Sequence, residues 1–366
     1  MKKLKEIDQQ NYLNNQNNKL WRKKLARFYR NKFALTAGII ILLLYILVIF
    51  APFIAPYSSN KNFKDKFFHP PTKIHFSDQN GLRRPFIYET KVNEGWANYE
   101  ITEDKKHTLK FFHRGESYKL LGFFESDIHL FGVEADVPIF LLGSDNYGRD
   151  LLSRILFGGR VSLFIGFFAI FITTFIGLII GGISGFYGGI IDSIIMRAAE
   201  VIMSIPSFYL LLALAAVLPL DVSSAFRFFL IVSILSFLGW AGMARVIRGM
   251  VLAVKNEDYV VAAKAIGAAD KRIIIKHILP STATYVIIRA TVAIPGYIIM
   301  ESGLSFIGLG IQEPSASWGN MLSSAQNITK ITDFPWLLLP GFFIFITVLS
   351  YNILGDGLRD ALDPKY

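Results

Sequence analysis

The sequence contains no cysteine. This absence excludes disulfide bonds, thiolate metal sites and thiol catalysis. The chain also lacks the phosphate-binding loop G-x-x-x-x-G-K-[ST], the metalloprotease pair H-E-x-x-H and the nucleophile turn G-x-S-x-G. We therefore predict a protein that is not an enzyme and that holds no metal or cofactor of its own.

Charge is also scarce, because 18% of the 366 residues are charged and 52% are hydrophobic. Such a composition is too apolar for an ordinary soluble enzyme. Six apolar runs approach or exceed the roughly 20 residues that a helix needs to cross a bilayer. These runs are 33–54, 161–187, 201–220, 228–244, 281–307 and 334–354. The pattern predicts an all-α polytopic membrane protein with six transmembrane helices, surrounded by membrane lipids.

The net charge of +10 does not indicate a nucleic-acid partner, because the basic residues gather beside apolar runs. Residues 1–32 carry ten Lys and Arg against two acids, and residues 245–276 carry seven against three. Short basic flanks stay on the cytoplasmic side of a membrane. With six spans, both clusters and the C-terminus fall on that same side. We expect a multi-pass membrane protein with both termini in the cytoplasm.

Residues 57–142 differ from the rest because they are polar and contain alternating stretches at 84–90, 108–113 and 118–123. Alternation of this kind predicts strands, so we expect a small, mainly β extracytoplasmic insertion between the first two spans. Five of the six histidines lie here, but without metal-ligand spacing. Surface or core histidines are favoured over a zinc site. The insertion is expected to contact a soluble partner or to cover the mouth of a pore through the membrane.

Glycines recur every four residues at 177, 181, 185 and 189. A smooth glycine face lets helix backbones approach closely, so we interpret it as a packing surface rather than a channel lining.

The basic segment 245–276 is predicted to form two short helices with a break between them. Asn256 is a good N-cap, and Gly267 stands where a helix end needs a positive φ. Asp270 is expected to cap a second short helix that ends at Pro280. One face of the first helix should carry Tyr259, Ala262, Ala263 and Ile266. This arrangement at a membrane surface predicts a part that docks into another protein.

Arg289 and Glu301 are ionisable residues inside an apolar run. Intramembrane charges usually face a bundle interior or a water-filled path. They lie twelve residues apart, about 18 Å along a helix, so they do not pair with each other. Both are candidates for the translocation path. The alternatives are an interhelical hydrogen bond for Glu301 and a snorkelling side chain for Arg289.

Four segments together resemble one known family. Residues 258–280 are similar to the EAA motif of ABC-importer permease subunits. Residues 142–154 resemble the G-T-D-x-x-G-R-D-x-x-S-R segment of the peptide/nickel permease group. Residues 301–322 are similar to that group's penultimate-span signature, and 355–364 to the C-terminus of its OppC/DppC-type subunits.

The resemblance implies the fold of an ABC type I importer permease. Such a subunit pairs with a second homologous permease and with two cytoplasmic ABC ATPase subunits, which bind ATP and Mg²⁺. An extracytoplasmic substrate-binding protein delivers oligopeptides or dipeptides, and nickel complexes or peptide antibiotics are alternative cargoes. The implied coupling-loop residues here are Asp258, Tyr259, Ala262, Ala263, Gly267, Asp270, His277 and Pro280.

The chain departs from the family pattern at Val261, where the motif usually has Glu, and Glu257, Asp258 or Lys264 could compensate. A stand-alone secondary transporter is a second hypothesis, but it would need more midplane polar sites than Arg289 and Glu301. A membrane-embedded enzyme is a third, and it lacks a nucleophile–base or metal set. We expect five parts, with a coupling loop at 249–280 inside the fourth: tail 1–32, first span 33–56, insertion 57–142, permease core 143–355 and tail 356–366.

Overall fold

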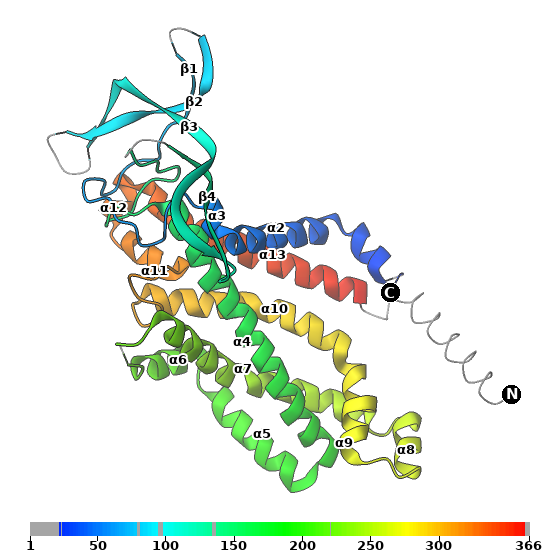
Figure 1. Cartoon of the computed structure of the whole chain (residues 1–366). Helices are drawn as coiled ribbons and strands as arrows, with labels where there is room; N and C mark the ends of the chain where they lie inside the picture. The colour runs from blue at the N-terminus through cyan, green and yellow to red at the C-terminus, as the bar shows by residue number, and fades with distance from the viewer. Residues whose placement is uncertain are drawn as a thin grey trace.

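The computed structural model describes residues 22, 24–78, 81–93, 98–133, 137–219 and 221–362. Most of the expected basic tail 1–32 lies outside these residues. Long helices form a bundle, and a sheet projects from one of its ends (Figure 1). We call this the sheet end. The opposite end, which carries the short helices α8 and α9, is the loop end.

Among the described residues, five helical segments are long and apolar enough to cross a membrane. They are α2 (Lys32–Ile49), α4 (Leu151–Tyr187), α7 (Ser224–Val254), the run Asp270–Phe306 and the run Pro335–Leu362. The run Asp270–Phe306 joins α9 (Asp270–Ile273), the π-helical turn η1 (Ile274–Ile278) and α10 (Leu279–Phe306). The run Pro335–Leu362 joins the 3₁₀ turn η3 (Pro335–Leu338) and α13 (Leu339–Leu362). The predicted all-α polytopic class is confirmed.

The third predicted span, 201–220, is not one helix. In its place α5 (Gly189–Ser204) and α6 (Ser207–Ala216) form a pair that is bent by 85°. The break falls at Pro206, which has no N–H to donate and forces the residue before it out of the α conformation. Ile205 is accordingly extended, with φ −92° and ψ 129°. A count of apolar residues gives Pro206 no special weight, so it does not predict the bend.

Two other helices continue beyond their predicted ends. The second span was expected at 161–187, but α4 begins at Leu151, where the Asp150 side chain accepts a hydrogen bond from the N–H of Ser153. The fourth was expected at 228–244, but α7 continues to Val254. Arginines ended the apolar counts in both cases. Inside α4, Arg160 donates hydrogen bonds to the carbonyls of Val48 and Ile49, and inside α7, Arg245 lies 3.9 Å from Glu200.

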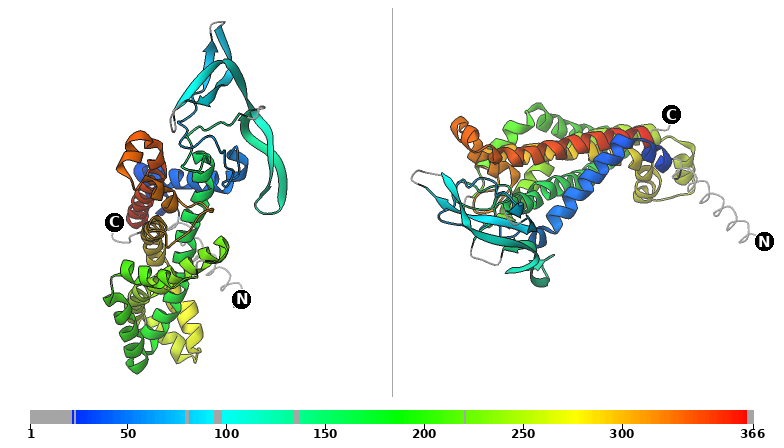
Figure 2. Two further views of the ribbon diagram at one scale, coloured as in Figure 1. Left: turned by 90° about the vertical axis from the view of Figure 1, so that its left-hand side faces the viewer. Right: turned by 90° about the horizontal axis from the view of Figure 1, so that it is seen from above.

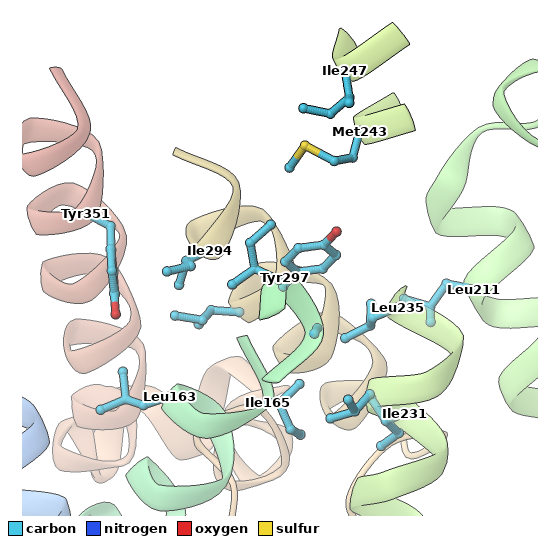
Figure 3. Close-up of a cluster of buried hydrophobic side chains, with 14 of the residues drawn as sticks. Leu163, Ile165, Leu211, Ile231, Leu235, Met243, Ile247, Ile294, Tyr297 and Tyr351 are labelled. Atoms are coloured by element: carbon cyan, nitrogen blue, oxygen red, sulfur yellow. The ribbon is translucent and has the colours of Figure 1, made fainter. Parts of the chain in front are cut away.

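The bundle core is built from side chains of most of the long helices (Figure 3). Leu163 and Ile165 come from α4, Ile231 from α7, and Tyr297 from α10, and all are buried. The hydroxyl of Tyr351 on α13 lies 3.0 Å from that of Tyr45 on α2, which joins the first and last helices to each other. The first and last helices therefore lie side by side, and α2 begins on the loop-end side, where α13 ends (Figures 1 and 2).

The predicted mainly β insertion is confirmed as an antiparallel sheet of order β1-β2-β3-β4. Its strands are β1 (His75–Asp78), β2 (Gly81–Val92), β3 (Tyr99–Leu120) and β4 (Phe124–Val133). The first half of β3 pairs with β2 and the second half with β4, so two hairpins share one long strand. The strand expected at 118–123 ends early, because Leu121 and Gly122 adopt positive φ and turn the chain.

Short helices complete the two ends. α3 (Ala51–Ile54) follows α2 and contacts β3 and β4. α11 (Trp318–Leu322), the 3₁₀ turn η2 (Ser323–Ala325) and α12 (Ile328–Asp333) lie at the sheet end (Figure 1). α8 (Asp258–Ala265) connects α7 to α9 at the loop end.

The predicted glycine face is where α4 packs against α7. A Cβ on Gly177 would lie 2.4 Å from the Met243 side chain, and one on Gly185 would lie 2.9 Å from the Arg248 carbonyl oxygen. Gly189 is not part of this face, because it starts α5 with φ +57° and nothing lies within 4 Å of its Cβ position. Three of the four glycines thus bring the two helices together.

Replacing Gly181 with alanine is expected to destabilise this contact. The added Cβ would sit 2.5 Å from the carbonyl oxygen of Ala244, which is backbone and yields only if α7 moves. Overpacking of this kind costs about 1–3 kcal/mol. Gly249→Ala is the control, because nothing lies within 4 Å of that position. Thermal unfolding in detergent should show a lower Tm for Gly181→Ala and an unchanged or higher Tm for Gly249→Ala. Equal Tm values would contradict the packing interpretation.

Candidate functional site

The loop end contains the segment that sequence analysis predicted as a docking part. α8 begins as expected near Asn256, but its N-cap is Glu257, and no side chain caps it. The N-cap of α9 is Ala269, and Asp270 lies in the first turn instead of capping it. The second helix does not end at Pro280. Pro280 lies in the first turn of α10, where the missing N–H costs no helical bond, so the helix continues to Phe306.

Gly267 has the predicted left-handed conformation, with φ +79°. Its N–H donates to the carbonyl of Lys264 at 2.9 Å, and the N–H of Ala268 donates to that of Ala263 at 3.1 Å. This pair of bonds is the Schellman motif, which satisfies carbonyls left free at a helix end. The chain reverses here between α8 and α9, and we call residues 258–270 the elbow.

The four residues expected on one face of α8 do not share one environment. Ala263 is buried together with Val260, and both belong to the same core cluster as Ile273, Ile274 and Ile278. Tyr259, Ala262 and Ile266 are exposed, and Ile266 is 84% exposed. Helical spacing gave the correct positions of these residues around the axis of α8. It did not predict which side of α8 packs against the rest of the protein. Of these four residues, Tyr259, Ala262 and Ile266 thus lie on the exposed sector of the elbow, which also includes Val261, and Ala263 is internal. His277 lies in the π-helical turn and is half-buried.

Ionic and cation–π contacts fix the elbow to the bundle. Arg248 on α7 donates two hydrogen bonds to Asp192 on α5, at 2.5 and 2.6 Å. The hydroxyl of Ser184 on α4 also donates to Asp192. The ammonium of Lys264 lies 4.8 Å from the centre of the Phe186 ring. Three helix ends and the elbow are therefore held as one unit.

Arg289 is exposed and lines a cavity of about 260 Å³ between the helices. Two further polar residues of its wall, Thr173 and Tyr297, are joined by a 3.0 Å hydrogen bond between their hydroxyls. The cavity also takes residues from α5, α6 and α7, so it lies where the bent pair meets the core. Its remaining lining is mostly apolar: Ile170, Met203, Leu238, Met243, Ala293 and Met300.

Glu301 lies elsewhere, fully buried among serines. It accepts hydrogen bonds from the hydroxyls of Ser305 at 2.7 Å and of Ser162 at 3.1 Å, the latter on α4. Ser162 in turn accepts the N–H of Trp318 at 3.1 Å. Glu301 thus ties α10 to α4 and α11, and it does not line the cavity that contains Arg289.

Sequence analysis assigned no role to the charges of segment 142–154, and these form an ionic cluster at the sheet end. Arg149 contacts Asp145 at 2.7 Å and Glu313 at 2.5 Å. Arg154, on α4 and 1% exposed, contacts Glu313 at 2.9 Å and Asp145 at 3.4 Å. Burial alone would lower the pKa of Arg149, but its bonds to Glu313 and the charge of Asp145 raise that pKa above its usual value. Glu313 stands 164 residues beyond Arg149, so no local motif predicts the pairing.

The histidines of the insertion do not gather into a metal site within the described residues. His69 is buried, and its ring contacts the carbonyl of Pro70 and the hydroxyl of Thr90. Burial lowers the pKa of His69 to about 4. The ring of His129 bridges the carbonyls of Ala55 and Glu116. These two rings act as internal braces of the insertion.

Comparison with known proteins gives matches over nearly the whole chain. Residues 177–366 match the model of the binding-protein-dependent transport system inner membrane component. Residues 19–71 match the N-terminal TM domain of oligopeptide transport permease C. The oligopeptide transport system permease protein OppC of Bacillus subtilis is 32% identical over 350 residues, which cover 94% of this chain and 90% of that protein. A match of that extent includes the insertion.

Two further relatives are more similar over a shorter range. The dipeptide transport system permease protein DppC of Bacillus subtilis is 42% identical over 225 residues, or 61% of this chain and 68% of the relative. The OppC protein of Escherichia coli K12 is 42% identical over 224 residues, or 61% of this chain and 72% of the relative.

Neutralising Asp145 should destabilise the sheet end. Asp145→Asn keeps an oxygen for the N–H groups of Tyr147 and Arg149 but removes a charge that faces two arginines. Breaking a buried ion pair costs about 3–5 kcal/mol. Glu125→Gln is the control, because its pair with Lys119 is exposed and contributes about 1 kcal/mol or less. Chemical unfolding in detergent measures both, and a loss at Asp145 no larger than at Glu125 would show that the cluster is not stabilising.

Proposed function

The chain belongs to the family of inner membrane components of binding-protein-dependent transport systems, and from this premise we propose that it forms half of the translocation path of an ATP-driven importer of oligopeptides or dipeptides. A second homologous permease would supply the other half. Two ABC ATPase subunits would bind ATP and Mg²⁺, and an extracytoplasmic binding protein would deliver the peptide. The main support for the proposal is the position of the elbow. Its exposed apolar sector lies at one end of a membrane-spanning bundle.

The elbow fits the role of a coupling helix. An amphipathic helix docks by placing apolar side chains into a groove of its partner. Here Tyr259, Ala262 and Ile266 face outward, while Val260 and Ala263 pack on the bundle. A movement of the ATPase groove would pull on the exposed sector, and the buried sector would pass that movement to the long helices.

The continuous run from Asp270 to Phe306 supports this coupling route. The run continues from the elbow to the cavity wall, so a displacement at α9 would pass through the π-helical turn η1 and the start of α10 to Arg289, which precedes Pro295 inside α10. The second arm of the elbow is α7, which is clamped to α5 through Arg248 and Asp192. We place the loop end in the cytoplasm, where the basic flanks of the sequence put it.

Val261 stands where related motifs carry Glu. Lys264 lies over the Phe186 ring and carries a positive charge, so it does not replace the missing carboxylate. Glu257 and Asp258 are exposed at the start of α8 and remain the groups that would meet a basic ATPase surface.

The cavity that contains Arg289 is the proposed position of the translocation path in this subunit. Methionine side chains adapt to ligands of varied shape, and Met203, Met243 and Met300 contribute to the wall. Arg289 would supply a positive charge to a peptide carboxylate. A wall of this composition suits substrates that share a backbone but differ in side chains. Glu301, held by serines, serves to join helices in this proposal.

Gly267→Val should uncouple ATP hydrolysis from uptake. A β-branched residue resists the left-handed conformation at φ +79°, so the elbow would change shape although nothing lies within 4 Å of its Cβ position. In proteoliposomes that contain the assembled importer and its binding protein, we expect ATPase activity to persist while peptide uptake falls at least tenfold.

Gly308→Val is the matched control for this experiment. Gly308 has φ +88° and open space around it, and it ends α10 with the same two backbone bonds. The control should carry a similar stability loss but keep the ratio of peptide transported to ATP consumed. Equal ratios for both variants and the unmodified importer would rule out the elbow as the coupling element.

Ile266→Ser should weaken ATPase binding. If the side chain enters a groove, its removal loses about 1.5–3 kcal/mol of burial, which corresponds to roughly a ten- to hundredfold weaker complex. Ile328→Ser is the matched control, because Ile328 is 81% exposed at the opposite end, compared with 84% for Ile266. Co-purification of the ATPase subunits through a tag on this chain measures both. Undiminished ATPase yield with Ile266→Ser would contradict the docking model.

A further inference from the structure

The hairpin of β3 and β4 exposes a concentration of large apolar side chains. Five of them are between 53% and 68% exposed: Phe111, Phe112, Leu121, Phe123 and Phe124. Soluble surfaces seldom leave so many aromatic rings in water, so a cluster of this kind marks a contact surface. We call these five residues the aromatic hairpin.

The hairpin bends back toward the bundle. The pairing register between β3 and β4 shifts between Arg114 and Tyr118, and such irregularities bend a strand. Each view shows the turn between β3 and β4 beside the bundle, near the end of α2, and away from the hairpin of β1 and β2 (Figures 1 and 2). The turn is thus set at the end of a membrane-spanning helix.

Specific contacts hold the bend in this direction. The His129 ring joins β4 to the carbonyl of Ala55 at 2.6 Å, just after α3, and to the carbonyl of Glu116 at 2.9 Å within the bend. Gly115 makes room for this ring, since a Cβ there would lie 2.7 Å from it. The Phe112 ring also lies 6.2 Å from that of Phe53 on α3. The direction in which the hairpin points is therefore fixed by contacts within the fold.

Two of the five residues have a backbone that side chains usually avoid. Phe112 has φ +55° and Leu121 has φ +54°. Left-handed conformations at bulky residues are uncommon and gather at functional positions. Here the two residues hold apolar side chains outside the buried core, so these side chains add no core packing to the segment.

We propose that the aromatic hairpin inserts into the lipid headgroup region beside α2 and holds the insertion against the membrane. The apolar surface continues from the exposed side chains of α2, including Ile46, Leu47 and Phe50, through α3 to Phe112. Phe and Leu side chains are suited to the boundary between headgroups and acyl chains.

Charge does not direct this contact toward one class of lipid. The basic side chains nearest the turn have acidic partners, with Lys119 3.2 Å from Glu125 and Arg114 3.9 Å from Asp127. The hairpin should therefore enter a neutral phosphatidylcholine surface as well as an anionic one.

The absence of cysteine makes a direct test simple. The full chain carrying Phe123→Cys, labelled with an environment-sensitive fluorophore, is reconstituted into phosphatidylcholine vesicles, with or without nitroxide on the lipid chains. The control is Leu82→Cys, which is 89% exposed on β2, in the hairpin that points away from the bundle. Nitroxide lipid should reduce the fluorescence at position 123 at least twofold and leave position 82 unchanged. Equal responses at the two positions would overturn the proposal.

A second measurement separates lipid from a protein partner. If the second permease subunit covers the hairpin, the probe at position 123 will respond to that subunit and not to nitroxide lipid, which also overturns the proposal. His129→Ala tests the brace without altering the apolar residues. It should reduce nitroxide quenching at position 123, because the bend loses its anchor to Ala55, and unchanged quenching would show that the brace does not set the contact.

Discussion

The helical run from Asp270 to Phe306 is the constraint on which the other features depend. Within a membrane the backbone must satisfy its own hydrogen bonds, and this run does so along most of its length, although Pro295 inside α10 has no N–H to donate. This run begins at the elbow, passes Arg289 beside the cavity and ends near Glu301, which its serine partners tie to α4. Pro280 lies in the first turn of α10, and the π-helical turn before it holds Ile274 and Ile278 in the core. The elbow and the cavity wall therefore belong to one continuous helical run.

Charged side chains fasten the bundle at its two ends. Asp192 and Arg248 join α5 to α7 at the loop end, while Arg154 joins α4 to Glu313 and Asp145 at the sheet end. Charges at these positions are paired near the polar boundaries, where the cost of desolvation is smaller than at the bilayer centre. The glycine contacts between α4 and α7 extend to the loop-end pair, since Gly185 faces the carbonyl of Arg248, and the middle of the bundle is mainly apolar packing.

Sequence patterns predicted the features that depend on local chemistry. Apolar runs located the spans, alternation located the sheet, and the glycine period located the contact of α4 with α7. Gly267 was identified because a positive φ at a helix end is a property of one residue. The features that were missed depend on residues distant in sequence. Glu313 pairs with Arg149 across 164 positions, and Arg154 near the start of α4 binds the same carboxylate.

The buried side of α8 was missed for a related reason. Helical spacing gives the angle between Tyr259, Ala263 and Ile266, but the sector that packs inward depends on where the chain reverses. The bend at Pro206 was visible in the sequence, yet mean hydropathy does not distinguish a bent pair of helices from one straight span. In each case the deciding information lay in a neighbour or a backbone angle, not in the residue count.

α4 connects the sheet end, where the insertion packs, with the loop end, where the elbow lies. At the sheet end its Leu152 packs against the core of the insertion, which includes Ile87 and Phe131. At the loop end its Phe186 lies beneath Lys264 of the elbow. The insertion is thus seated on the same helix that supports the elbow, and it is not a separately tethered domain. If the elbow moves with an ATPase, the loop end of α4 should move with α7, because Ser184 of α4 and Arg248 of α7 both bind Asp192. A lipid contact at the aromatic hairpin would fix the sheet end of α4 relative to the membrane plane, so α4 would tilt about that end.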